Sequence, residues 1–216
     1  MPQTRSELTR VRLIETAEEL FAERGLEAVS LRDVCAAAGQ RNHSAAQYHF
    51  GDRMGLVVAV FEHRMRIVDE RRHGLLDLAP DDDVVAIVGA LVRPLTSVVA
   101  STNGWYGRFL ERSRWNPMTN EAFAELPAWT SYARAVKLLA AQLPDLPDDV
   151  RANRLEQVAT LLIGSVAAWE WRRQRGQRHL PVDALDRELI STLVAVVNAP
   201  AITDRAALHL TPWEQQ

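Results

Sequence analysis

The side chains that could do chemistry in this sequence gather between Ser30 and Arg53, and their types suit binding to DNA. Amide, hydroxyl and guanidinium groups hydrogen-bond to base edges in the major groove and to backbone phosphates. Small residues between them suit a helix that lies in that groove. The candidate DNA-binding residues are Ser30, Arg32, Arg41, Asn42, His43, Ser44, Gln47, Tyr48, His49 and Arg53.

Two short helices joined by a tight break are expected to position these side chains. Ser30 is placed to cap the first helix, and the carboxylate of Asp33 can reach back to its free amides. Gly39 suits a left-handed C-cap that ends this helix. After the turn, Asn42 can cap a second helix over residues 43–50.

The place of each side chain along the second helix predicts its role. Residues at or near the start of that helix are expected to face base edges, namely Arg41, Ser44 and Gln47. Residues at its end and at the start of the following helix are expected to contact phosphates, namely Tyr48, His49 and Arg53.

Over residues 14–61 the sequence resembles the DNA-binding region of the tetracycline-repressor (TetR) family of bacterial regulators. The resemblance lies in the order and spacing of four segments: AEELFAERG at 17–25, SLRDVCAAAG at 30–39, YHFGDR at 48–53, and Leu56-Val57. Between Gly39 and Phe50 the chain is one residue longer than the commonest family pattern, and Gln47 stands where an aromatic residue is frequent. The register of the base contacts therefore stays open by one position.

The resemblance implies a homodimer that binds a palindromic double-stranded DNA operator through this region. It also implies that the remaining helices bind a small-molecule effector, and that two copies of the last two long helices form a four-helix interface. The predicted function is transcriptional regulation, most often repression that the effector releases. The alternative is a helical ligand-binding or interaction protein without operator recognition, which the weak basic character and the altered turn would suit.

No spacing typical of an enzyme or a metal site is found. The six histidines are scattered, and none has a second and a third ligand at metal-binding spacing. Glycine loops that cradle phosphate, nucleophile elbows and paired carboxylates do not stand out. Asp81-Asp82-Asp83 is better explained as a solvated turn that caps a helix. We therefore predict a protein that is not an enzyme and needs no metal or cofactor.

Charge alone argues against DNA binding. The 216 residues carry a net charge of −3, and residues 1–63 are themselves slightly acidic. The placement of the arginines favours it, because they lie at the start of the chain and on both sides of the helix-turn-helix segment. No apolar run reaches the roughly 18 residues that cross a bilayer, and the start lacks a signal-peptide core. With a single cysteine, Cys35, on a predicted buried face, we expect a cytoplasmic protein without membrane contact.

Helical periodicity predicts an all-α fold of two domains, with no strand. Residues 1–52 are expected to form a three-helix helix-turn-helix domain, which a helix over 53–74 connects to a helical ligand-binding and dimerisation domain at 75–216. Further helices are expected at 7–24, at 84–100 with a kink at Pro94, at 104–115 capped by Asn103, at 120–143 with a bend at Pro127, and at 182–199.

Aromatic residues are dense between residues 105 and 132, and they indicate either core packing or a pocket between helices. For the pocket, the candidate ligand-binding residues are Trp105, Tyr106, Phe109, Arg112, Trp129 and Tyr132. The arginine could orient an acidic group, so the predicted effector is mostly apolar with an acidic end.

Residues 158–169, VATLLIGSVAAW, carry no charge, so this helix should be covered nearly all round. A second copy of the chain would provide that cover, and a larger monomeric core is the alternative. The candidate interface residues are Leu155, Leu162, Val166, Trp169, Leu189 and Leu193.

Overall fold

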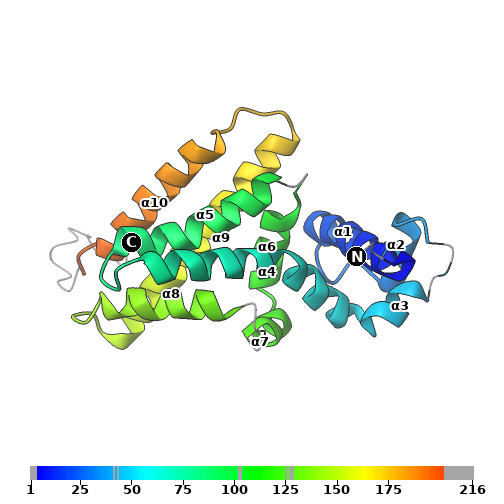
Figure 1. Cartoon of the computed structure of the whole chain (residues 1–216), viewed down its shortest axis with the longest axis horizontal. Helices are drawn as coiled ribbons and strands as arrows, with labels where there is room; N and C mark the ends of the chain where they lie inside the picture. The colour runs from blue at the N-terminus through cyan, green and yellow to red at the C-terminus, as the bar shows by residue number, and fades with distance from the viewer. Residues whose placement is uncertain are drawn as a thin grey trace, which may run out of the picture.

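The computed structural model describes residues 4–40, 42, 44–101, 104–124, 126 and 129–201. Its helices are α1 (Arg5–Arg24), α2 (Leu31–Ala37), α3 (Ala45–Phe50), α4 (Arg53–Leu78), α5 (Val84–Ser101), α6 (Tyr106–Arg114), α7 (Pro117–Ala124), α8 (Thr130–Ala141), α9 (Asp148–Gln174) and α10 (Val182–Asn198). Within the described residues no strand is present (Figure 1). The predicted all-α fold is confirmed.

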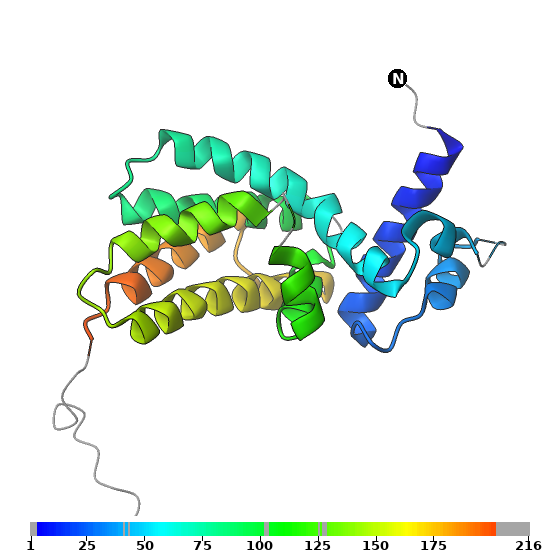
Figure 2. The ribbon, with the colours of Figure 1, turned by 90° about the horizontal axis from the view of Figure 1, so that it is seen from below.

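Helices α1, α2 and α3 gather at one end of the molecule around the start of α4, and we call this group the N-terminal bundle (Figures 1 and 2). The rest of α4 packs with α5–α10 in the C-terminal bundle. Helix α6 contacts both α1 and α9, so it lies where the two bundles meet. The buried residues form one core that runs through both bundles. The division into two domains therefore stays a prediction.

Local hydrogen bonds begin α2 and α4 as the sequence predicts, whereas the N-cap of α3 is Ser44 and not the predicted Asn42. The Oγ atom of Ser30 accepts the amide of Asp33 at 3.2 Å, and the Asp33 carboxylate accepts the amide of Ser30 at 2.9 Å. Gly39 ends α2 with a φ of 68°. At the start of α4, the Asp52 carboxylate accepts the amide of Gly55 at 2.7 Å. These bonds satisfy amides that a helix terminus otherwise leaves free.

Three helix boundaries differ from the predicted ones. Helix α1 begins two residues early, because Thr4 and Glu7 form a capping box of their own. Helix α3 begins at Ala45 rather than at residue 43, and α4 continues past Gly74 to Leu78.

The helices of the C-terminal bundle also depart from the prediction. The single helix expected over residues 120–143 is instead two, α7 and α8. Helix α5 runs on through Pro94 to Ser101. Helix α6 begins at Tyr106 with Trp105 as its N-cap, so the prediction of a helix from residue 104 capped by Asn103 is wrong. Asn103 itself and the predicted bend at Pro127 lie outside the described residues.

Helix α5 is long and apolar enough to cross a membrane by length and composition, which the sequence analysis did not anticipate. Most of its residues are nevertheless buried, against α4, α8, α9 and α10. Its apolar character is therefore explained by its central place in the bundle, as Figure 2 shows.

Candidate functional site

The outer surface of α3 carries side chains predicted to read DNA. Ser44, Gln47 and Tyr48 are exposed, and Tyr48 keeps 83% of its surface in solvent. Because residues three or four apart share one side of a helix, these three form a single exposed face, which we call the reading face. Ala46 is fully buried and Phe50 is half-buried, and both pack into the core of the N-terminal bundle. The reading face is therefore free to meet a partner while the rest of α3 is anchored.

Two tight turns hold the reading face in place. Before α3, the side-chain oxygen of Asn42 accepts the amide of Ser44 at 3.0 Å. After α3, Gly51 has a φ of 76°, a conformation that favours glycine. A Cβ atom on Gly55 would overlap the carbonyl oxygen of Phe50, so α3 and α4 approach as closely as glycine allows. The angle of α3 is thus set by contacts between backbones.

Two of the candidate DNA-binding residues also have partners within the chain. The Ser30 hydroxyl lies 2.6 Å from the Asp33 carboxylate, and its hydrogen bonds hold the pKa of Asp33 below the usual range. Arg53 donates from Nη1 to the carbonyl of Glu27 at 3.1 Å and to that of Leu26 at 3.4 Å. Arg53 therefore ties the α1–α2 loop to α4, a structural role that the sequence analysis did not predict.

The remaining candidates divide by their exposure. Arg32 and Asn42 are exposed, and His49 is half-buried beside the rings of its two neighbours in the chain. Arg41 and His43 lie outside the described residues.

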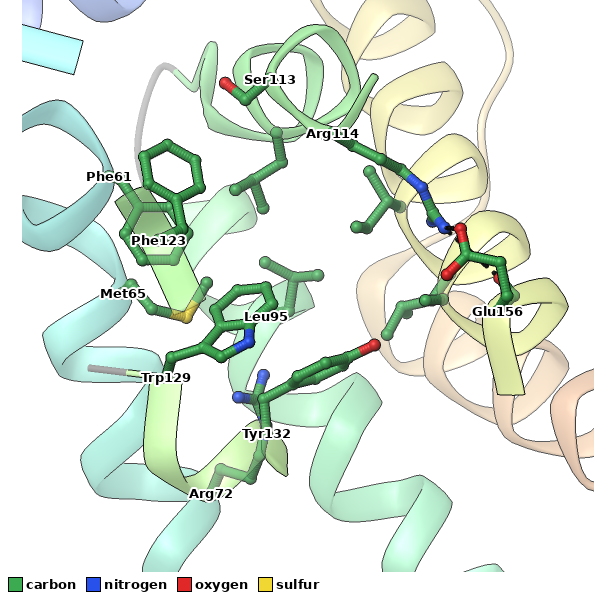
Figure 3. A pocket seen from close by; sticks show the side chains of 14 residues that line it. Phe61, Met65, Arg72, Leu95, Ser113, Arg114, Phe123, Trp129, Tyr132 and Glu156 are labelled. Atoms are coloured by element: carbon green, nitrogen blue, oxygen red, sulfur yellow. Dashed lines mark hydrogen bonds and ion pairs between the residues drawn. The ribbon is translucent and has the colours of Figure 1, made fainter. Parts of the chain in front are cut away.

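A cavity of about 280 Å³ lies among α4, α5, α6, α7, α8 and α9 (Figure 3). Phe61 and Phe123 stack on one wall with ring centroids 3.9 Å apart. Trp129 and Tyr132 lie beside them, with centroids 4.5 Å apart. The other apolar residues of the lining are Met65, Leu95, Leu110, Ala159, Leu162 and Ile163. Apolar walls of this kind are typical of small-molecule sites.

A few polar groups interrupt the apolar lining. Arg114 pairs with Glu156 at one edge of the cavity. Arg72 is only 3% exposed and donates from Nη1 to the Ser131 hydroxyl at 3.2 Å. Burial lowers the pKa of Arg72 to about 10, so it stays positively charged at neutral pH.

A shallow groove between α9 and α10 leaves part of the uncharged stretch of α9 uncovered. Its lining includes Leu161, Gly164, Ala168 and Leu189, and Leu161 is 41% exposed. We call these four residues and their surroundings the α9–α10 face. Val166, by contrast, is fully buried within the protomer.

The comparisons with known proteins agree with the helix-turn-helix geometry. The family model described as bacterial regulatory proteins, tetR family, matches residues 13–60. The matched segment spans the helix-turn-helix, so the N-terminal bundle is similar to the DNA-binding region of the TetR family. Over 63 residues it is 43% identical to the HTH-type transcriptional repressor Rv3405c of Mycobacterium tuberculosis, in a match that covers 29% of this chain and 32% of the relative. The chain thus spans about a third of the length of that relative.

Solved structures share the fold over most of the chain. A TetR family transcription regulator from Marinobacter aquaeolei VT8 aligns with a TM-score of 0.60 at 12% identity, covering 87% of this chain and 94% of the other. The fatty acid degradation regulator FadR from Bacillus halodurans aligns with a TM-score of 0.61 at 15% identity, covering 90% and 97%. The matched family model describes bacterial regulatory proteins, and its match lies over the helix-turn-helix.

The structure brings only two of the six predicted ligand-binding residues to the cavity, Trp129 and Tyr132. Tyr106 and Phe109 are fully buried where α6 meets the N-terminal bundle, and the Phe109 ring lies 6.3 Å from that of Phe21. For these two residues the core-packing alternative describes their surroundings. Trp105 and Arg112 are not among the residues that line the cavity, and Arg112 is exposed.

The predicted interface residues also differ in where the structure places them. Leu162, Val166 and Leu193 face the interior of their own protomer, and Leu155 packs partly against the same core. Trp169 and Leu189 line the α9–α10 groove. The stripe of α9 that a second copy could cover is therefore the one through Leu161, Gly164 and Ala168, not the one through Val166.

Arg72 is a cavity residue that the sequence analysis missed, although the sequence holds a signal for it. Phe61, Met65, Val68 and Arg72 recur at the spacing of one helix face. The first three are apolar and buried, so the fourth places a charge at the end of a core stripe.

Two buried carboxylates hold the start of α6. Glu18 of α1 accepts the amide of Trp105 at 3.3 Å, and Glu170 of α9 accepts the amides of Gly107 and Arg108 at 3.1 and 3.0 Å. Such amides at a helix start attract negative charge. Burial nevertheless raises the pKa of Glu18, and it raises that of Glu170 to about 7. Helix α6 is thus tied to the N-terminal bundle by one acid and to α9 by the other.

Proposed function

We propose that this chain is a DNA-binding transcription regulator of the cytoplasm, which represses by occupying a palindromic operator as a homodimer. The observation that carries the proposal is the exposed reading face of Ser44, Gln47 and Tyr48, presented by a helix that tight turns hold in position. The family match over residues 13–60 supports DNA binding. The relative described as a transcriptional repressor supports repression.

The partner in the homodimer is a second copy bound through the α9–α10 face. This face supports the proposal because it is apolar, carries small residues at Gly164 and Ala168, and leaves Leu161 41% exposed. Pairing two such faces would remove apolar surface from water, which favours association. The two reading faces would then meet half-sites about 34–36 Å apart, or a multiple of that distance.

The effector binds in the cavity and lowers operator affinity. Leu110, Ser113 and Arg114 of α6 line the cavity, and the start of the same helix bonds to Glu18 of α1. A molecule that moves α6 would therefore change the position of the N-terminal bundle. To release DNA, the effector must bind more tightly to the dimer conformation whose two reading faces do not match the half-site spacing than to the conformation that binds DNA. A ligand shifts the population of two conformations only when its affinities for them differ.

The test is binding of the full chain to the DNA that flanks its own gene, measured by mobility shift and fluorescence anisotropy. We expect a palindromic segment to bind, with an affinity that falls as salt rises because phosphate contacts release counterions. Tyr48→Ala should weaken binding, whereas the matched control Leu78→Ala should not. Both side chains are equally exposed, at 83% and 84%, but Leu78 lies at the far end of α4.

The alternative function predicts another result. If the folded protein shifts no fragment of that DNA at low salt, the chain is better described as a helical ligand-binding protein without operator recognition. Its cavity could still bind a ligand in that case.

A further inference from the structure

One hydrogen-bond donor beside the cavity has no acceptor. Among the described residues, no carboxylate oxygen lies within 4.0 Å of the guanidinium group of Arg72, which is 3% exposed. Its Nε atom is buried and has no acceptor in the described part of the chain. A buried N–H without an acceptor is costly. The guanidinium group therefore has a donor that a ligand could use.

Asp69, one turn earlier on α4, is the carboxylate whose charge acts on Arg72, and it opposes the lowering of the Arg72 pKa by burial. Its Oδ1 atom accepts the amide of Ser131 at 2.9 Å. Glu156, on α9, pairs with Arg114. Neither carboxylate accepts a hydrogen bond from the Nε atom of Arg72. That unused N–H beside a positive charge matches an oxyanion of a ligand.

The planar shape of the guanidinium group indicates which kind of acidic group the ligand carries. Figure 3 shows Arg72 directed from α4 towards the rings of Trp129 and Tyr132, at the cavity wall. An arginine presents several N–H donors in one plane, and it binds planar oxyanions such as carboxylate with two parallel hydrogen bonds. The free Nε–H is one such donor.

The walls and the volume of the cavity indicate the chemical nature and size of the uncharged part of the ligand. Phe61, Phe123, Trp129 and Tyr132 supply aromatic surface, against which an aromatic ring packs favourably. The volume of about 280 Å³ lies near the lower end of the range for small-molecule sites, which is about 300–1,000 Å³. This size suits a small ligand, such as one aromatic ring with a short acidic side chain.

We infer that the cavity binds a small aromatic monocarboxylate, whose carboxylate accepts hydrogen bonds from Arg72 and whose ring lies against the aromatic wall. This inference rests on the proposed function, because it names the chemical class of the effector. It replaces Arg112, which is exposed and outside the cavity lining, as the residue that orients the acidic group.

The test compares two probes of the same shape, 3-phenylpropanoate and the neutral 3-phenylpropanamide, with the full chain in the absence of DNA. Binding is followed by calorimetry and by tryptophan fluorescence, which Trp129 at the cavity wall should report. We expect the acid to bind at least about tenfold more tightly than the amide, because a hydrogen bond to a charged group contributes that much or more. Hexanoate should bind more weakly than 3-phenylpropanoate.

Two variants locate the preference for the acid. Arg72→Gln should abolish it, whereas Arg112→Gln, which also removes an arginine but from an exposed position, should leave it unchanged. The melting temperature of each variant without ligand is measured beside the wild type, and the comparison of acid and amide is made at a temperature where all three proteins are folded. If folded Arg72→Gln still preferred the acid, Arg72 would not be the residue that binds the carboxylate.

Several outcomes would overturn the inference without any variant. They are equal binding of acid and amide to the wild type, equal binding of hexanoate and 3-phenylpropanoate, and no binding of either phenyl probe up to about 1 mM. Operator binding by the ligand-free protein is measured separately, so failure of the ligand assignment is distinguishable from failure of the proposed function.

Discussion

Replacing Gly55 with alanine should displace the reading face, and Gly74→Ala in the same helix is its control. A Cβ atom at position 55 would overlap the carbonyl oxygen of Phe50 and lie 3.2 Å from its carbonyl carbon. At position 74 the added atom would meet nothing within 4 Å. Because the neighbour of Gly55 is backbone, it cannot rotate away as a side chain could. Helix α3 must therefore move relative to α4.

Three contributions give the expected size of the effect. Alanine is better than glycine inside a helix by about 1 kcal/mol, and this gain applies at both positions. At position 55 the overlap costs about 1–3 kcal/mol, and displacing the Gly55 amide from the Asp52 carboxylate, 2.7 Å away, removes a cap that contributes about 1 kcal/mol. We expect Gly74→Ala to raise the free energy of unfolding by about 1 kcal/mol and Gly55→Ala to lower it by about 1–3 kcal/mol.

Urea denaturation followed by circular dichroism measures both changes, read from the midpoint at constant slope. Operator affinity is then measured without urea, at a temperature where both variants are folded. Gly55→Ala should bind the operator more weakly than its folded fraction explains, because the reading face has moved. If Gly55→Ala were as stable as Gly74→Ala and bound DNA like the wild type, the close approach of α3 and α4 would not set the position of the reading face.

Three further predictions follow from the contacts. Gln47→Ala should weaken operator binding by about 1–3 kcal/mol and relax selectivity at one base position, which titrations with base-substituted operators measure. Arg53→Ala should weaken operator binding and also lower the free energy of unfolding, because its bonds to the α1–α2 loop are lost, and urea melts measure that loss. Leu161→Arg should give folded monomers by light scattering, because Leu161 is exposed on the α9–α10 face. Val166→Arg should instead destabilise the protomer, because Val166 is buried within it. A dimeric Leu161→Arg protein would exclude the α9–α10 face as the interface. Because burial raises the pKa of Glu170 from 4.5 to about 7, the contribution of its protonated form to stability is present below about pH 4.5 and is lost as pH rises through about 7. Glu170→Gln should flatten that fall in urea melts across this window, and an unchanged pH profile would contradict it.

The N-terminal bundle could be predicted closely because its structure depends on residues near each other in the chain. The capping pair Ser30 and Asp33, the left-handed Gly39, and Asp52 at the start of α4 all act within three or four positions. Such bonds follow from residue types and spacing alone. The all-α fold and the TetR resemblance were likewise contained in the sequence, since helical periodicity and the order of the family segments require no knowledge of distant contacts.

Only the tertiary structure decided which side of α9 faces inward. The stretch over residues 158–169 is uncharged on every side, so its periodicity cannot distinguish the buried Val166 from the exposed Leu161. The cavity could not be predicted for a similar reason. Phe61 lies far along the chain from Phe123 and Trp129, and its ring meets theirs only when α4 packs beside α7 and the start of α8. Whether an aromatic residue or an arginine fills the core or lines a space depends on those distant neighbours, and local spacing does not specify them.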